Sequence, residues 1–305
     1  ILIFILFFYT LLLSTIGYGI LFKNLCFEKF ESLNDENSIY IGFYGLCLIT
    51  LISLITSLFF SHNFFHNLLL HGAGIFYLIF VKTKDKKKYL KFIVLISLAI
   101  FSLLLISKTN DDLPYYHLPF TKYLTEQKII FGMGHLNHGY NLLSSLFFLN
   151  STFYLPFIKY SSFHFGILFS LIFFNFFLLK EIFSNKNHQI INTLYIFAFA
   201  YFNLSFNRLA EFGTDKSGQL IIVILTIKLF DLVCFNQKSK KIEKILFLVP
   251  LLAFCITLKT YFLPYILLSF VLFFINNKQI KNLKFILNSS SFIFFIVILF
   301  FNFLH

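Results

Sequence analysis

Residues 109–149 read TNDDLPYYHLPFTKYLTEQKIIFGMGHLNHGYNLLSSLFFL. This is the longest part of the chain that is too polar to cross a bilayer, and hydrophobic runs precede and follow it. It holds two adjacent carboxylates and three histidines: Asp111, Asp112, His117, His135 and His138. If the protein carries out chemistry, we expect that chemistry in this stretch.

The rest of the chain is mostly apolar. Of its 305 residues 58% are hydrophobic and only 12% are charged, which is too little polar surface for a soluble globule of this size. Because a helix needs roughly 20 apolar residues to cross a bilayer, the sequence predicts an all-α, polytopic bundle of about ten spans. The candidate spans are 1–22, 39–60, 64–81, 92–107, 163–180, 189–206, 217–235, 245–258, 261–276 and 285–304.

Three lysine clusters predict the orientation of these spans. They lie at Lys82–Lys91, Lys238–Lys244 and Lys278–Lys284, and lysine-rich loops of this kind stay in the cytoplasm. Counting the spans between them places residues 109–149 outside, together with the 207–217 link and the turn at Lys259. Three polar segments are therefore expected to share the outer surface.

We expect a single transmembrane domain over residues 1–305, with short juxtamembrane helices in its outer loop. The segment Tyr140–Leu149 is predicted to be a helix that lies along the outer face or dips into it. The domain is predicted to comprise four helices in 1–107, a periplasmic loop in 108–162 and six further helices in 163–305. Because the only methionine is Met133 and the chain begins with Ile1, we expect a piece of a longer protein.

Asp112 and Asp111 follow a predicted helix end at the water boundary. A carboxylate there could take a proton from a sugar or lipid hydroxyl as that hydroxyl attacks. Alternatively, the string Asn-Asp-Asp-Leu-Pro simply ends one helix and caps the next. His117, between Pro114 and Pro119 in a segment expected to be stiff and non-helical, could bind a substrate phosphate or orient Asp112, or could merely be solvated.

Two basic residues elsewhere are candidates for binding phosphate. Lys259 interrupts a long apolar run, so it either lines a cavity as a phosphate ligand or extends to the outer headgroups. Arg208, the only arginine, lies near Asp215 in the second outer polar cluster. A guanidinium suits a pair of phosphate oxygens, although an interfacial anchor is the simpler interpretation.

Metal and nucleic-acid binding have weaker support. His135 and His138 lie in a glycine-rich turn, and His62, His66 and His71 recur at near-helical spacing, but the simpler interpretation is that they occupy loops and turns. The sequence identifies no cofactor with certainty, and a divalent metal is left open. The net charge of +12 is better explained by membrane orientation than by nucleic-acid binding.

The stretch from Asp112 to His117, then Lys122, Gly132–Gly134 and Asn141–Ser145, resembles a group of bacterial multi-spanning proteins related to the GT-C glycosyltransferases. The GT-C superfamily consists of lipid-carrier-dependent sugar transferases and includes the protein O-mannosyltransferases and the aminoarabinose transferases. The resemblance implies a catalytic base at Asp112, or failing that Asp111. It also implies carrier-phosphate or substrate contacts, for which we consider Tyr116, His117, Lys122, Asn141, Arg208, Asp215 and Lys259.

The function implied is transfer of a sugar from a polyprenyl-phosphate carrier to a lipid, glycan or protein acceptor, at the periplasmic face of a bacterial inner membrane. Its partners would be membrane lipids and the lipid-linked sugar, with the oligomeric state left open. The chain departs from many superfamily members because four predicted helices precede the acidic loop. A transporter or lipid flippase, and a non-catalytic membrane assembly subunit, remain the alternatives.

Overall fold

All regular elements in the described part of the chain are helices, and that part contains no strand, so the all-α prediction is confirmed there. The computed structural model describes residues 2–28, 38–81, 86–101, 112–141, 144–155, 157–184, 188–205, 214–235, 241–267 and 286–304. Asp111 and Arg208 lie outside these ranges.

The long helices coincide with apolar runs of the sequence. They are α1 (Leu2–Phe27), α3 (Ile41–Ser57), α4 (Phe64–Phe80), α5 (Lys86–Phe101), α8 (Phe165–Ile182), α9 (Gln189–Ser205), α10 (Thr214–Cys234), α11 (Lys241–Leu258) and α14 (Ser290–Leu304). The largest difference from prediction among their first residues is at α5, which begins at Lys86 rather than 92. Most of the predicted span 261–276 falls outside the described residues.

Three described helical segments are long and apolar enough to cross a membrane: Leu2–Phe27, Lys159–Ile182 and Thr214–Cys234. They indicate a membrane protein. The apolar helices α3, α4 and α14 have 17, 17 and 15 residues, which is shorter than the roughly 20 that a perpendicular crossing needs. The predicted count of about ten crossings therefore stays a prediction.

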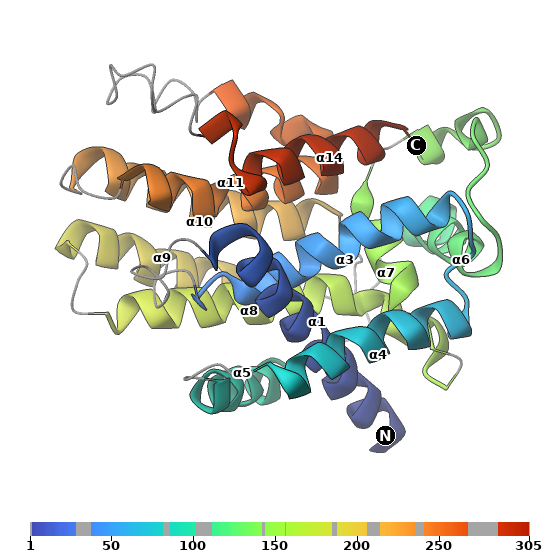
Figure 1. Cartoon of the computed structure of the whole chain (residues 1–305), viewed down its shortest axis with the longest axis horizontal. Coiled ribbons are helices and arrows are strands. Elements are labelled where there is room, and N and C mark those ends of the chain that lie inside the picture. The colour runs from blue at the N-terminus through green and yellow to red at the C-terminus, as the bar shows by residue number, and fades with distance from the viewer. Residues whose placement is uncertain are drawn as a thin grey trace.

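The short elements gather at one end of the bundle, on the right in Figure 1, where α6 (Leu118–Glu126) lies beside the turn between α3 and α4. Two backbone hydrogen bonds join them: His62 N–H donates to Leu124 O at 2.8 Å, and Ile129 N–H donates to Ser57 O at 2.9 Å. This loop-bearing end also contains the beginning of α10 and the end of α11.

Helix α7 (Ser145–Thr152) is enclosed within this end, and all eight of its residues are buried. It packs against α3, α4, α6, α8 and α11. The helix predicted over Tyr140–Leu149, along the outer face or dipping into it, is observed over Ser145–Thr152, where other helices enclose it and it does not lie along a surface. Its polar side chains bond within the protein: Ser151 Oγ donates to Phe148 O at 2.7 Å, and Ser145 Oγ donates to Thr257 Oγ1 of α11 at 3.0 Å.

Buried polar side chains hold α7 against α4. His62 Nδ1 lies 2.6 Å from Ser151 Oγ, and His71 Nε2 lies 3.0 Å from Thr152 O. Asn67 Nδ2 donates to Ser151 O at 2.9 Å. The histidines after α3 thus serve as hydrogen-bonding groups, and the described residues contain no cluster of metal ligands around them.

Helices α1, α3 and α4 approach closely through glycines. A Cβ on Gly45 of α3 would overlap the carbonyl oxygen of Thr15 in α1, and a Cβ on Gly17 of α1 would overlap that of Gly74 in α4. Small residues that let backbones meet in this way are typical of helix pairs in membranes.

Candidate functional site

The candidate site starts from a distorted turn that Pro119 imposes. Proline has no N–H, so the carbonyl of Tyr115 loses the partner four residues ahead that an α-helix would give it. The chain instead forms a π-turn, η3 (Leu113–His117), in which Leu118 N–H donates to Leu113 O. Asn137 Nδ2 donates to the Tyr115 carbonyl at 3.3 Å. The expected non-helical segment is therefore corrected to a helical one, which accommodates Pro119 in the first turn of α6.

The wide turn directs Tyr116 into the protein, where its ring packs against Gly139 and Phe147. Its hydroxyl donates to Asp112 Oδ2 at 3.5 Å, the outer limit of a hydrogen bond. Burial, and then the negative charges of Asp112 and Asp215, raise the pKa of Tyr116 to about 12. Tyr116 therefore stays protonated at neutral pH and acts as a donor.

Asp112 itself is exposed at the start of η3, and its side chain makes no capping hydrogen bond to that turn. The Asp112 side chain therefore does not cap η3, which is one of the two roles considered from the sequence. Its carboxylate is placed at the water-accessible edge of the site, with the Tyr116 hydroxyl as a weak anchor.

His117 is buried, with 3% of its surface exposed. Neither ring nitrogen has a hydrogen-bond partner among the described residues, and the ring lies against Tyr116 and Phe147 at centroid distances of 4.3 and 5.2 Å. Burial lowers its pKa to about 4, Asp112 opposes that shift, and the positive charge of Lys259 adds to it. The imidazole is therefore neutral at pH 7, and it offers a substrate an N–H and a lone pair rather than a positive charge.

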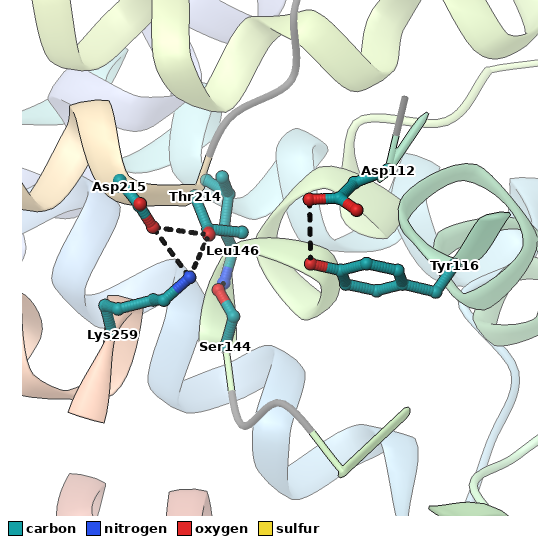
Figure 2. A network of polar contacts seen from close by, with 7 residues as sticks. All are labelled: Asp112, Tyr116, Ser144, Leu146, Thr214, Asp215 and Lys259. Carbon is teal, nitrogen blue, oxygen red and sulfur yellow. Dashed lines mark hydrogen bonds and ion pairs between the residues drawn. The ribbon is translucent and has the colours of Figure 1, made fainter. Parts of the chain in front are cut away.

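The second half of the site joins the beginning of α10 to the end of α11 (Figure 2). Lys259 Nζ lies 2.7 Å from Asp215 Oδ1 and donates to Thr214 Oγ1 at 3.3 Å. Thr214 Oγ1 in turn donates to Asp215 Oδ1 at 3.1 Å. Asp215 is in the first turn of α10, where the helix dipole favours a negative charge. The Lys259 turn is therefore in contact with the beginning of α10.

A cavity of ≈ 90 Å³ lies between the two halves. Its lining residues are Tyr116, Asn141, Ser144, Phe147, Thr214, Lys259 and Thr260. Ligand pockets usually enclose roughly 300–1,000 Å³, so this cavity suits one small polar group such as a phosphate rather than a whole sugar. Figure 2 shows Ser144 between Lys259 and Tyr116, with the Asp112 carboxylate next to the Tyr116 hydroxyl.

Comparison with models of protein families identifies the family of this chain. A model described as "Domain of unknown function (DUF8201)" matches residues 1–304. The chain belongs to the DUF8201 family. No curated protein and no solved structure matches it at the significance required.

In this DUF8201 member, most of the predicted site residues within the described ranges come together. Tyr116, Asn141 and Lys259 line the cavity, and Asp112, His117 and Asp215 interact with them or lie within electrostatic range. Lys122 departs from the prediction: its ammonium is 3.6 Å from Glu126 and 5.7 Å from the Tyr160 ring, and it does not line the cavity. Asp111 and Arg208 lie outside the described residues, so the roles predicted for them stay predictions.

Sequence reasoning missed Ser144, Phe147, Thr214 and Thr260, which also line the cavity. One signal was available for Ser144, which precedes an apolar run in the manner of a helix N-cap; it accepts from Leu146 N–H at 3.4 Å. Thr214 and Thr260 carry no such signal, because hydroxyl residues are frequent throughout this chain.

The described residues at this site include no cluster of metal-binding side chains. Within the described ranges no three His, Cys, Asp or Glu side chains form a group that could hold an ion. Asp215 is already paired with Lys259. His135 and His138 are exposed in the loop and are not among the residues that line the cavity.

Proposed function

We propose that this chain is a membrane glycosyltransferase of GT-C-like architecture, with about ten spans, that transfers a sugar from a polyprenyl-phosphate carrier to an acceptor. The reaction would take place at the loop-bearing end, on the periplasmic face of a bacterial inner membrane. One observation carries the proposal: Tyr116 and Lys259, from two segments far apart in the sequence, line one small cavity, and the exposed Asp112 carboxylate and the buried neutral imidazole of His117 lie beside Tyr116.

Asp112 would act as the general base. Its carboxylate removes the proton from an acceptor hydroxyl, and the freed oxygen attacks the anomeric carbon of the sugar. The bond between that carbon and the carrier phosphate breaks, and the phosphate leaves with the electron pair. Attack from the face opposite the phosphate inverts the anomeric carbon.

Lys259 would stabilise the departing phosphate from within the cavity. Its pairing with Asp215 and Thr214 fixes the position of the ammonium before substrate arrives, so little is lost in orienting it. The neutral His117 and the protonated Tyr116 would supply further hydrogen-bond donors. Because the cavity holds only about one phosphate group, the sugar and the acceptor would lie outside it, towards the exposed Asp112.

The test is Asp112→Asn in the full-length gene, with Lys122→Gln, a half-buried residue outside the cavity, as the matched control. Loss of a general base typically lowers the rate by about 10²–10⁴-fold. We expect mass spectrometry of surface glycans to show loss of the transferred sugar in Asp112→Asn and not in Lys122→Gln. Unchanged glycans in the Asp112 variant would rule out the proposed base.

A transporter is the second candidate, because one ion pair is buried between α8 and α10 near the end of α8. Lys228 Nζ of α10 is 2.8 Å from Glu181 Oε1 of α8, and the two side chains are only 16% and 11% exposed. Charges within helices mark ion and substrate paths. Glu181→Gln discriminates between the candidates: a glycosyltransferase keeps its transfer activity when the folded protein is recovered, whereas a transporter that uses this pair loses flux. In a non-catalytic assembly subunit, Asp112→Asn and Lys122→Gln would have equally small effects.

A further inference from the structure

An open apolar groove runs between α5 and α8, at a distance from the candidate site. Its volume is ≈ 530 Å³, within the range of ligand pockets. Leu95, Leu98 and Phe183 on its walls are 62%, 59% and 76% exposed. Exposing these apolar side chains to water is unfavourable, whereas contact with hydrocarbon is not.

Two lysines line the same groove, Lys91 from α5 and Lys180 from α8. The Lys180 ammonium lies 5.4 Å from the centre of the Phe92 ring. Neither lysine forms an ion pair with a carboxylate in the part of the chain that the structure describes. The described residues that line the groove therefore carry two positive charges and no carboxylate.

The groove lies at the end of α8 opposite the candidate site. Gly166, in the first turn of α8, donates to Asn150 Oδ1 of α7 at 3.2 Å. Lys180 follows 14 residues later, roughly 21 Å along the helix axis. In Figure 1, α5 and α8 lie together at the left, away from α6. Lysines near the end of a membrane helix meet lipid headgroups while their apolar neighbours meet acyl chains.

We propose that this groove binds an anionic phospholipid. The lipid phosphate lies between the Lys91 and Lys180 ammonium groups, and an acyl chain follows Leu95 and Leu98 along α5. Lys91 and Leu98 are seven positions apart, so this apolar track extends roughly 10 Å. The uncompensated positive charge selects an anionic lipid over a zwitterionic one. The site is independent of the proposed sugar transfer.

The experiment measures lipid retention by the full chain. Protein purified in detergent is mixed with phosphatidylglycerol or phosphatidylcholine, and bound lipid is counted by native mass spectrometry. Lys91→Gln with Lys180→Gln removes the two charges of the groove. Lys128→Gln with Lys159→Gln removes the same charge from two exposed lysines at the other end and is the matched control. Leu95→Trp fills the groove, and thermal unfolding checks that each variant folds.

We expect wild-type protein to retain phosphatidylglycerol in preference to phosphatidylcholine. The Lys91/Lys180 variant should bind phosphatidylglycerol about thirtyfold more weakly, as the loss of two lysine charges near an anionic headgroup implies. The control pair should bind as wild type does, and Leu95→Trp should lower retention of both lipids. Equal retention of the two lipids by wild type, an equal loss in the control pair, or full retention by Leu95→Trp overturns the proposal.

Discussion

At the scale of single residues, His117 is the least compensated polar group of the candidate site. A buried imidazole without hydrogen-bond partners costs stability, because water would satisfy both nitrogens in the unfolded chain. Such a group persists where it contacts something other than protein. This is the residue-level reason for placing a substrate hydroxyl or phosphate oxygen beside it.

The lowered pKa of His117 predicts how stability depends on pH. Between its ordinary value of 6.5 and its folded value of about 4, the unfolded chain binds a proton that the folded chain does not. Stability is therefore lost as pH falls from 6.5 to 4, by at most about 3 kcal/mol from this group. His117→Phe should remove this part of the pH dependence, as measured by chemical unfolding in detergent at several pH values.

The exposed His135 provides the control position for that measurement. His135→Phe removes an imidazole from the same loop but not from the buried site. Its unfolding free energy should fall with pH as steeply as that of wild type. If His117→Phe and wild type show the same slope between pH 6.5 and 4, His117 does not titrate as we describe.

At the scale of elements, the sequence predicts the positions of the long helices well, because each contains a long apolar run. It fails for elements whose form depends on a contact elsewhere. The π-turn before Pro119 requires Asn137 to satisfy the Tyr115 carbonyl, and a pattern of residues does not show that two distant positions meet. Helix α7 is missed as a buried element for the same reason, because its surroundings come from five other helices.

The close packing of α1 on α3 can be tested at Gly45. Gly45→Ala places a methyl group against the Thr15 backbone, which cannot move without separating the two helices. We expect destabilisation of roughly 1–3 kcal/mol, as for other overpacked cores, in unfolding measurements on purified protein. Gly72→Ala, also in a helix but with nothing within 4 Å of the new methyl, is the control and should be neutral or slightly stabilising. Equal effects at the two positions would contradict the close approach.

At the scale of the whole molecule, the orientation in the membrane is open to direct labelling. Asp215 lies at the candidate site, and the exposed Cys234 lies 19 residues further along α10, about 28 Å away along the axis. In intact cells, a membrane-impermeant maleimide should react with Lys122→Cys and not with the natural Cys234. Permeabilised cells should show labelling at both positions. Reaction at Cys234 alone in intact cells would reverse the proposed orientation.

The contact between Lys259 and Asp215 illustrates what a count of membrane crossings can predict and what it cannot. Counting crossings between lysine clusters puts both residues on one surface. The count does not show that the ammonium would be 2.7 Å from Asp215, or that Lys259 would line a cavity with Ser144 and Thr260. Those contacts depend on helix rotation and packing, which the lengths of apolar runs leave undetermined.

The enclosure of α7 has a consequence for biogenesis. Ser145 Oγ donates to Thr257 Oγ1 at 3.0 Å, a partner that is synthesised 112 residues later. With only eight residues, α7 is too short to remain in a bilayer alone. The contact between α7 and α11 can therefore form only after α11 has been translated. The centre of the protein thus closes around α7 only once this later neighbour has been made.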